Sequence, residues 1–581
     1  MCGRLRVGPK MIREQRLLAT VMYPTLVLWC ALNSGKAHAI TVGEKLLECS
    51  ATDSHDASRD AGIGAMKRTR LLLLLLLLTT VARAEGPVDI GSRLEMFVDD
   101  HLIDSMADAR LTLHRPVPRE RVLACDRSWE GNGVNYVSVF QDGPIYRMYY
   151  RGRNRKYQPG KIGDPNIPQS VGIVDTRAVY CYAVSTDGIH WTKPKLRLFE
   201  YEGSKENNIV WDGVGAGGMC PFKDTSPNCR PGERYKAMVR GTSPEYQKLG
   251  IRALTSPDGI HWKLSKQPAS GVPGDLDGEL TTFWDASRGE YRIYNRKYTA
   301  HPHGRDILTA SSKNYMSGWT AAVLLKYRPR SVYAKPGDSE LYSNGVFPYY
   351  RAPHIFVGFP TRYLDRGWSS SMKALPQLKL RELRSRVSPR EGTALTDGMF
   401  MSSRDGLTFY IWPESFIRPG PQRVGSWFYG DHNSNWGVLE TPSVLDGAPN
   451  ELSLYMTEYT QNKIDTGYLR RYSLRIDGFA SIQAPLSGGE LITRPLQFDG
   501  KQLVLNFSTG AAGSIRVEIQ DNQGKPIPGY TLSDCDDTFG DDLGRTVVWK
   551  GGSDVSRLTG QSVRLRFVLK DADLFSLRFI N

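Results

Sequence analysis

Cysteine is scarce in this chain. Eight cysteines are spread over 581 residues, and five of them follow residue 84, namely Cys125, Cys181, Cys220, Cys229 and Cys535. A sparse and odd-numbered set excludes a disulfide-rich scaffold. Cys220 and Cys229 flank one expected turn and could form a bridge in an oxidising compartment, with two buried thiols as the alternative. The sequence also lacks CxxC and HExxH motifs, so it does not support a structural zinc site.

Apolar runs long enough to cross a bilayer are also missing. Leu71–Leu78 is an eight-leucine run that follows the basic segment Met66–Arg70 and precedes Val81-Ala82-Arg83-Ala84. A basic start, a short apolar centre and a small-x-small end are typical of a cleaved signal peptide rather than a membrane span. We therefore expect a leader of mis-assigned or dispensable sequence at 1–65 and a signal peptide at 66–84. A second signal-like stretch, Leu17–Leu32, lies upstream. The mature protein is expected to be secreted or periplasmic, in a bacterium, with no integral membrane segment.

Long blocks of like charge are absent as well. The formal charge is +14, and residues 1–84 contribute 12 Lys/Arg and 6 Asp/Glu, which leaves a mature chain of +8. Because this excess is spread along the sequence, a nucleic-acid-binding arm is not indicated. It leaves room for an anionic substrate.

Short repeats are what the chain does have. Three segments share Ser-x-Asp-Gly followed by an aromatic residue, and a degenerate copy is a fourth: Ser185–Trp191, Ser256–Trp262, Ser403–Phe409 and Ser312–Trp319. A turn repeated at this spacing in a strand-rich sequence predicts a small β-sheet used several times, as in a propeller.

A second repeat gives the number of sheets. Hairpins of an apolar strand, a turn and a second strand rich in aromatics recur five times, with second strands opening at Tyr146, Tyr235, Tyr291, Ile355 and Leu452. We predict an all-β fold, in which a five-bladed β-propeller at 85–481 is followed by a C-terminal β-sandwich at 482–581. The segment from Glu95 to Arg115 is expected to supply the strand that closes the ring.

Seven aspartates in these repeats are interpreted as structural. A short carboxylate in a turn most often caps that turn, and hairpin turns of a blade lie far from the central funnel. The seven are Asp142, Asp187, Asp224, Asp258, Asp285, Asp405 and Asp446.

Carboxylates upstream of the first strand of each unit are the catalytic candidates. They are Glu130, Asp212, Asp277, Glu279, Glu340 and Glu440. Glycoside cleavage needs one carboxyl to protonate the leaving oxygen and another to activate water or attack the anomeric carbon. We favour Asp277 and Glu340 as the pair, with Glu130 third, and assign Glu440 to substrate binding. A solvated surface acid is the alternative for each.

Arginines recur at the end of the second strands. Arg151, Arg240 and Arg296 each stand five residues after the opening tyrosine, and Arg362 ends the equivalent strand of unit four. Together they could clamp a sulfate or carboxylate, or each could pair with a carboxylate of a neighbouring blade. Trp436 and His354 are expected to be packing residues, although Trp436 sits where a sugar ring could stack.

The acidic loop of the C-terminal region has two interpretations. Its aspartates are Asp534, Asp536, Asp537, Asp541 and Asp542. The first interpretation is a calcium site. The spacing lacks the EF-hand pattern, so we favour the second, an acidic turn. We expect no cofactor.

The whole pattern resembles the five-bladed propeller glycoside hydrolases of families 32 and 43 and their uncharacterised secreted bacterial relatives. The resemblance is carried by the Ser-x-Asp-Gly-x-x-Trp units, by Trp129-Glu130-Gly131 and by the trailing sandwich, and it extends over residues 93–581. The Trp-x-Asn-Asp-Pro-Asn-Gly, Arg-Asp-Pro and Glu-Cys signatures of family 32 are not in matching places. Family 43 implies an Asp base, an Asp modulator and a Glu acid, which blade position matches to Glu130, Asp277 and Glu340. The repeats are also similar to the Asp-box of sialidases, one residue short.

The sequence thus predicts a secreted glycoside hydrolase that acts on a polysaccharide or oligosaccharide by paired-carboxylate chemistry. A non-catalytic carbohydrate-binding or cell-surface propeller and a sialidase-like hydrolase are the alternatives. The expected partner is a carbohydrate rather than a nucleic acid, and the oligomeric state is left open.

Overall fold

A computed structural model describes residues 86–581 except 160–170, 176, 241–249, 273–276, 299–303, 330–339, 433–434 and 460–465. Expected segments 1–65 and 66–84 lie outside the described residues. Residues Glu85–Asn581 form one compact unit. In the part of the chain that the structure describes, no helix has the length and apolarity of a membrane span.

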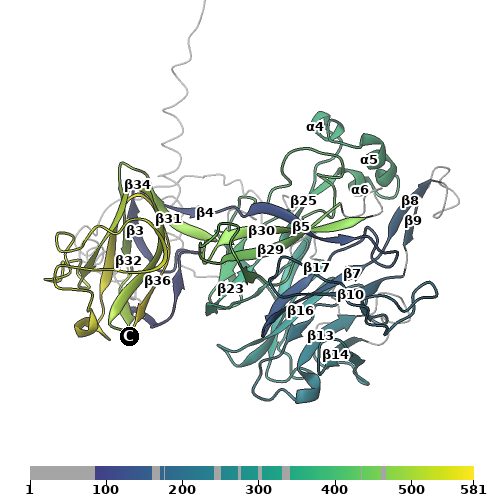
Figure 1. The fold of residues 1–581 in the computed structure, drawn as a ribbon, viewed down its shortest axis with the longest axis horizontal. Helices are drawn as coiled ribbons and strands as arrows, with labels where there is room; N and C mark the ends of the chain where they lie inside the picture. The colour runs from purple at the N-terminus through teal and green to yellow at the C-terminus, as the bar shows by residue number, and fades with distance from the viewer. Residues whose placement is uncertain are drawn as a thin grey trace, which may run out of the picture. The chain divides into compact units, whose positions relative to one another are not determined.

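Antiparallel sheets dominate the described chain, which confirms the all-β prediction (Figure 1). Six sheets of three or more strands succeed one another between residues 117 and 475, and we group them into five units, called blades 1 to 5, by counting the two sheets of the fourth unit together. The first three have four strands each. Blade 1 contains β6 (Ser138–Asp142), β7 (Ile145–Gly152), β10 (Val179–Ser185) and β11 (Ile209–Trp211). Blade 2 contains β12 (Phe222–Lys223), β13 (Tyr235–Arg240), β14 (Ile251–Ser256) and β15 (Lys263–Leu264). Blade 3 contains β16 (Asp277–Asp285), β17 (Glu290–Tyr298), β18 (Arg305–Ser312) and β19 (Val323–Leu324).

Blade 4 is split in two. Its five-stranded part contains β20 (Lys326–Arg328), β22 (Phe347–Tyr349), β23 (Ala352–Gly358), β26 (Met401–Ser403) and β27 (Thr408–Ile411). Its three-stranded part contains β21 (Glu340–Leu341), β24 (Thr361–Asp365) and β25 (Ala394–Gly398). Helices α4 (Ser370–Lys373), α5 (Leu378–Ser385) and α6 (Pro389–Thr393) are inserted between β24 and β25, whose pairing resumes at Asp365 and Ala394. An all-β prediction did not include these helices.

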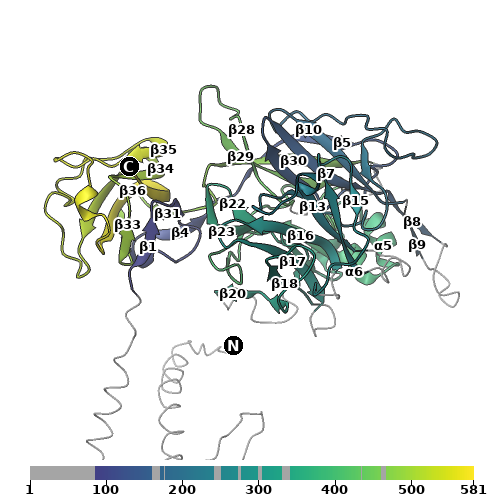
Figure 2. The same cartoon turned by 90° about the horizontal axis from the view of Figure 1, so that it is seen from below.

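Blade 5 takes one strand from the other end of the described chain. It contains β28 (Leu439–Thr441), β29 (Glu451–Glu458), β30 (Gly467–Arg475) and β5 (Val117–Cys125), and β5 lies antiparallel beside β30 (Figures 1 and 2). An N-terminal strand therefore completes this sheet, as expected. The prediction that Glu95–Arg115 supplies this strand was wrong, because those residues pair elsewhere.

The C-terminal strands form a separate sheet that also includes strands from the N-terminal side. From that side come β2 (Glu95–Met96), β3 (Ile103–Ala107) and β4 (Arg110–Leu113). They join β31 (Ala480–Ala484), β32 (Gly489–Thr493), β34 (Gln502–Gln520), β35 (Asp541–Thr546) and β36 (Arg564–Ile580). A short parallel pair, β1 (Val88–Gly91) and β33 (Leu496–Phe498), lies apart from this sheet, as does the hairpin of β8 (Arg155–Pro159) and β9 (Val171–Asp175). Two 3₁₀ turns, Pro231–Glu233 and Ser556–Leu558, complete the described elements. The predicted region 482–581 did not include β2, β3 and β4, which belong to the same sheet.

The Ser-x-Asp-Gly repeats are self-capped turns. In the first, the Ser185 hydroxyl oxygen accepts from the Gly188 N–H at 2.9 Å, and Asp187 Oδ1 accepts from the Ile189 and His190 N–H groups at 2.8 Å. The turns at Asp258 and Asp405 repeat these bonds. The structural interpretation of the three aspartates is thereby confirmed.

Each complete turn is also bonded to a tyrosine of the preceding blade. The turn carbonyls of Gly188, Gly259 and Gly406 accept from the hydroxyls of Tyr455, Tyr149 and Tyr294, at 2.5, 3.0 and 2.7 Å. These bonds join blade 5 to blade 1, blade 1 to blade 2, and blade 3 to blade 4. Blade 2 has Met238 at the equivalent strand position, and the turn that it would face is the degenerate copy at Ser312–Trp319. Asp224 of blade 2 instead accepts from Tyr291 of blade 3 at 2.8 Å, and Asp477, after blade 5, accepts from Tyr349 of blade 4.

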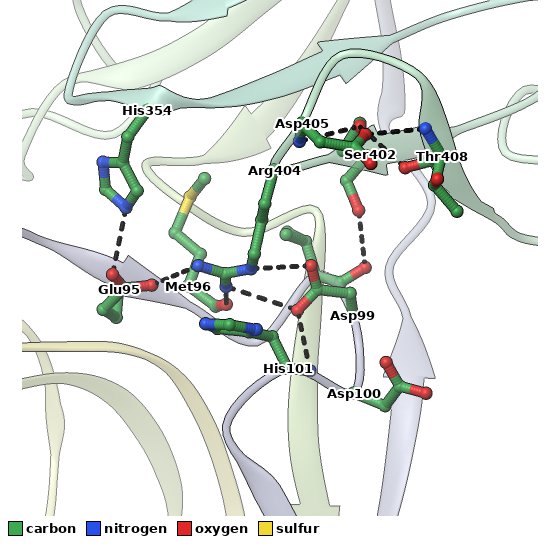
Figure 3. Close-up of polar contacts among 12 residues, drawn as sticks. Glu95, Met96, Asp99, Asp100, His101, His354, Ser402, Arg404, Asp405 and Thr408 are labelled. Atoms are coloured by element: carbon green, nitrogen blue, oxygen red, sulfur yellow. Dashed lines mark hydrogen bonds and ion pairs between the residues drawn. The ribbon is translucent and has the colours of Figure 1, made fainter. Parts of the chain in front are cut away.

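Arg404 links blade 4 to the C-terminal sheet (Figure 3). It occupies the variable position of the third Ser-x-Asp-Gly turn and donates to Glu95 at 2.6 Å and to Asp99 at 2.9 Å. Both carboxylates are almost fully buried, and His354 of β23 lies 3.0 Å from Glu95. Burial would raise the pKa of Glu95, but Arg404 and His354 outweigh it and hold the pKa at about 2. His354 is therefore a polar contact between the two sheets rather than only a packing residue.

A candidate active site in an arginine-lined pocket

Residues near the strand ends of several blades line one pocket. Its volume is about 680 Å³, and 22 described residues line it. Two of these residues are carboxylates, Asp212 and Glu391. Four are tyrosines: Tyr136, Tyr298, Tyr342 and Tyr429. Eight are arginines: Arg151, Arg153, Arg155, Arg177, Arg240, Arg296, Arg305 and Arg390. The pocket is thus strongly cationic.

The strand repeat explains how three of the arginines meet. Arg151, Arg240 and Arg296 lie at or near the C-terminal ends of β7, β13 and β17, which occupy the same place in blades 1, 2 and 3. Equivalent strands of adjacent blades bring equivalent residues to the same end of the structure. The arginine prediction therefore placed these three at one pocket.

Tyrosine rings hold several guanidinium groups in place. The guanidinium carbon of Arg151 lies 4.7 Å from the Tyr136 ring centre, and that of Arg296 lies 4.1 Å from the Tyr342 ring centre. Arg305 lies about equally close to Tyr298, Tyr342 and Tyr363, at 5.0 to 5.3 Å. Stacking of this kind fixes a flat guanidinium and leaves its edge free to donate.

The pKa of Tyr342 reflects the positive potential that these arginines create. Burial would raise the pKa of its phenol, but the guanidinium groups of Arg296 and Arg305 and the Tyr429 hydroxyl outweigh burial, and the pKa lies below its ordinary value. The Tyr429 hydroxyl donates to the Tyr342 oxygen at 2.6 Å. The pocket thus favours negative charge.

Arg151 and Arg240 differ in their protein partners. Arg151 is buried and donates to the Gly217 and Gly133 carbonyls at 3.1 and 3.3 Å, and burial lowers the pKa of its guanidinium. Arg240 is half-buried at the end of β13, and its side chain forms no hydrogen bond or ion pair with another described residue. Arg240 is therefore the arginine most available to a ligand.

Asp212 is the carboxylate at the end of β11. Its side chain is 17% exposed and lies 2.9 Å from Arg177. Burial raises the pKa of Asp212 above its ordinary value, and the opposing effect of Arg177 is smaller. A carboxyl with a raised pKa binds a proton more readily than an exposed aspartate, and general acids of hydrolases have this property.

The loop after Asp212 needs glycine to pack. Gly215 has φ +81°, and a Cβ built there would lie 2.2 Å from the Val239 Cβ. A Cβ on Gly218 would lie 2.8 Å from the Gly278 carbonyl oxygen. The glycines thus let the loop lie against blades 2 and 3 and form one wall of the pocket.

Glu279 lies next to the lining residue Gly278, on β16. Its side chain is buried, and Oε1 has no hydrogen-bond partner among the described residues. Burial raises the pKa of Glu279 to about 8, while Cys220 and Arg151 oppose the rise. Glu279 is therefore a neutral acid at pH 7.

The three predicted catalytic carboxylates have different surroundings. Glu130 is fully buried, accepts from Lys193 at 2.7 Å and Tyr150 at 2.5 Å, and is not among the lining residues. Glu340 accepts from Arg305, which lines the pocket. The side chain of Asp277 lies outside the described residues; its backbone pairs with Arg296, and the next residue lines the pocket.

Three predicted binding residues are placed away from the lining. Arg362 donates to Asp397 at 2.6 and 2.9 Å, so it pairs with a carboxylate of its own blade and not of a neighbouring one. Trp436 is buried and donates to the Val346 carbonyl at 3.0 Å, as a packing residue does. Glu440 accepts from Tyr350 at 2.6 Å and from Asn450 at 3.0 Å.

Five lining arginines were not predicted, because no repeat marks them. Arg153 and Arg155 precede or begin β8, Arg177 lies before β10, Arg305 begins β18 and Arg390 lies in α6. Helix α5 contacts β8 (Figure 2), so the helical insertion and the hairpin approach the pocket together. An irregular cluster of this kind has no period in the sequence.

The cysteines and the acidic loop provide no further candidate site among the described residues. The five cysteines after residue 84 are free thiols, so Cys220 and Cys229 are not bridged. In the acidic loop, Asp537 pairs with Arg516 at 2.6 Å, Asp542 with Arg545 at 3.0 Å, and Asp541 with Arg475. Within the described residues, no group of three His, Cys, Asp or Glu side chains could hold a metal.

No protein-family model and no curated protein matches the chain. Solved structures that resemble it include glycoside hydrolases and related carbohydrate-active enzymes. A sucrose-6-phosphate hydrolase from Lactobacillus gasseri is 11% identical over 79% of this chain and 93% of its own, with a TM-score of 0.33. A family 43 arabinoxylan arabinofuranohydrolase from Bacillus subtilis is 11% identical over 78% and 96%, with a TM-score of 0.26. An N-acetylgalactosamine deacetylase from F. plautii is 12% identical over 63% and 96%, with a TM-score of 0.36. At these TM-scores the similarity carries no argument, so the function proposed for the chain rests on the pocket.

Proposed function

We propose that the chain is a glycoside hydrolase that binds an anionic saccharide in the arginine-lined pocket. The observation that carries the proposal is the eight arginines that line one pocket of about 680 Å³ with two carboxylates. Guanidinium groups bind sulfate and carboxylate oxygens bidentately, and tyrosines offer the flat faces against which sugar rings pack. A pocket of this size suits a small saccharide.

Asp212 is the proposed general acid. Its raised pKa and its position in the lining fit a group that protonates the leaving oxygen of the glycosidic bond. The second carboxyl is proposed to be Asp277, whose backbone lies at the pocket, or Glu391 of α6, which lines it. Secretion through residues 66–84 remains part of the proposal.

A non-catalytic binding protein is the second candidate. It is favoured by the ion pairs of both lining carboxylates, since Asp212 pairs with Arg177 at 2.9 Å and Glu391 with Arg384 at 3.4 Å. A carboxylate held in an ion pair is a weaker proton donor.

Asp212→Asn separates the two candidates. For a hydrolase, turnover of an anionic oligosaccharide should fall by about a hundredfold or more, because an amide cannot act as the acid, while the Kd stays within about threefold. Release of reducing ends and isothermal calorimetry give the two quantities. Asp446→Asn, in an exposed hairpin turn, is the matched control. A wild-type protein that binds anionic saccharides and hydrolyses none of a panel of neutral, sulfated and uronate-bearing glycans would support the binding protein.

A further inference from the structure

Tyr342 is a lining residue whose chemistry the hydrolase proposal leaves unused. It lies directly after β21, and its backbone N–H donates to the Thr361 carbonyl at 2.7 Å. Its own carbonyl accepts from the Arg296 guanidinium at 2.9 Å. Both backbone groups are therefore held, and the half-buried side chain forms part of the pocket lining.

The groups around the Tyr342 hydroxyl favour its ionised form. The Tyr429 hydroxyl donates to it at 2.6 Å, and the guanidinium carbons of Arg296 and Arg305 lie 4.1 and 5.3 Å from the Tyr342 ring centre. Two cations and a donated hydrogen bond stabilise a phenolate more than a neutral phenol. The pKa of Tyr342 accordingly lies below its ordinary value in spite of burial. Tyr342 is thus a phenol that can lose its proton inside the pocket.

The carboxylates of the lining are poorer proton acceptors. Asp212 lies 2.9 Å from Arg177 and Glu391 lies 3.4 Å from Arg384, and an ion pair favours the deprotonated form of a carboxyl. The described residues of the lining include no histidine and no lysine. A phenolate binds a proton more strongly than a carboxylate, because an unperturbed phenol has the higher pKa. Tyr342 is therefore the strongest base that this part of the lining offers.

A base next to arginines suits the removal of a proton from the carbon beside a carboxylate. In a uronate, the ring carbon that bears the carboxylate has such a C–H bond, and its ionisation places negative charge on the carboxylate oxygens. Guanidinium groups bound to those oxygens stabilise the charge as it develops. Arg240 is suited to this role, because its half-buried side chain lines the pocket and forms no hydrogen bond or ion pair with another described residue.

We propose that the pocket catalyses β-elimination on a uronate-bearing saccharide, with Tyr342 as the base and Arg240 bound to the carboxylate. The Tyr342 phenolate takes the proton of the ring carbon that bears the carboxylate. The C–H electron pair becomes a double bond to the neighbouring ring carbon, the bond from that carbon to the glycosidic oxygen breaks, and this oxygen takes a proton from Asp212. Tyr342 then loses its proton to solvent and Asp212 regains one, so no water and no other reactant is consumed. The inference shares with the proposed function an anionic saccharide bound in this pocket, and it does not require hydrolysis.

The products distinguish elimination from hydrolysis. Purified wild-type protein is incubated with oligomers of galacturonate, glucuronate, mannuronate and guluronate, and with their carboxyl-reduced, neutral counterparts. Elimination leaves an end sugar whose new double bond is conjugated to the carboxylate and absorbs ultraviolet light. Its mass is lower by one water than that of the hydrolysis product. We expect unsaturated products from at least one of the uronates and from none of the neutral counterparts.

Tyr342→Phe should lower the rate of elimination by about a hundredfold or more and leave the Kd of the uronate within about threefold, because the ring remains and the base is lost. Tyr429→Phe should lower the rate by about tenfold and move the ionisation of Tyr342 to higher pH, because the donor to the phenolate is lost. Ultraviolet titration, as a difference from Tyr342→Phe, follows this ionisation without any substrate. Tyr410→Phe is the matched control, since Tyr410 is a half-buried tyrosine of β27 that is not a lining residue.

The two proposals fail in different ways. Saturated products alone would overturn elimination and leave the hydrolase proposal standing. Unsaturated products from a protein that hydrolyses no glycan would support elimination and end the hydrolase proposal. Unsaturated products formed by Tyr342→Phe at the wild-type rate would overturn the role of Tyr342, and a protein that cleaves none of these saccharides would overturn both proposals.

Discussion

At the scale of single residues, burial decides what each carboxyl does. Glu130 and Glu279 both come before the first strand of a blade or at its start, and both are buried. Glu130 has Lys193 beside it and forms an ion pair, whereas Glu279 has a thiol neighbour and stays neutral. The sequence offered both as equivalent acids, because the partner of a buried group comes from another blade and is not visible in the local pattern.

Glu279→Gln is expected to make stability less dependent on pH. The pKa of Glu279 is raised from 4.5 to about 8, so the wild-type fold binds a proton that the unfolded chain has lost. The free energy of unfolding should therefore fall as pH rises from about 4.5 to about 8, by on the order of a few kcal/mol. Glutamine has no proton to lose, so the variant should lack this fall.

Urea unfolding at pH 5 and pH 8 measures the difference. Glu414→Gln, at an exposed position, serves as the control. Parallel pH profiles for the Glu279→Gln and wild-type proteins would show that Glu279 is ionised at neutral pH.

At the scale of elements, the tyrosine-to-turn bonds connect the blades. Tyr294→Phe removes the donor to the Gly406 carbonyl, which lies in a fully buried interface. The loss should be about 1 to 2 kcal/mol of unfolding free energy, because a buried carbonyl loses its partner. Tyr149→Phe acts at a different interface, so the double variant should show the sum of the two losses.

Denaturation midpoints of the two single variants and the double variant check this. Met238, at the equivalent position of blade 2, shows that a blade can do without the hydroxyl where the facing turn is degenerate. Single variants as stable as wild type would mean that apolar packing alone holds the blades together.

The ion pairs of Arg404 with Glu95 and Asp99 are a second connection between elements. Arg404→Thr copies the residue found at the same turn position in blade 1, Thr186, so the turn itself should persist. Glu95 and Asp99 would be left buried without a cation, and the expected loss is about 3 to 5 kcal/mol near neutral pH.

The stability loss of Arg404→Thr should depend on pH. With Arg404 present, the pKa of Glu95 is held at about 2, so its contribution to stability is present above pH 4.5 and is lost as the pH falls toward 2. Thermal unfolding of Arg404→Thr and wild type should therefore converge in acid. Thr186→Ala, an exposed residue, is the control. A constant difference at all pH values would contradict the role of the ion pair.

At the scale of the whole molecule, the repeats allowed much of the fold to be predicted. Turns, hairpins and the use of an N-terminal strand in blade 5 follow from local patterns and their spacing. The prediction assigned that place to Glu95–Arg115 instead of Val117–Cys125, because the partner of this strand, β30, lies far along the chain and is not visible in the local pattern. The helical insertion was missed because it interrupts the repeat.

The site was predictable only where it follows the repeat. Arg151, Arg240 and Arg296 share one strand position and were found together. Arg177, Arg305 and Arg390 lie on a loop, a third strand and a helix, so their meeting depends on tertiary structure alone.

The central claim is that the arginine-lined pocket cleaves an anionic saccharide. Its most direct test is the release of reducing ends by the purified wild-type protein from sulfated, uronate-bearing and neutral oligosaccharides, identified by mass spectrometry. We predict turnover of a charged oligosaccharide that inorganic sulfate inhibits competitively and that Arg240→Gln weakens mainly through KM. Turnover confined to neutral sugars, or turnover of a charged one unaffected by sulfate and by Arg240→Gln, would contradict the account.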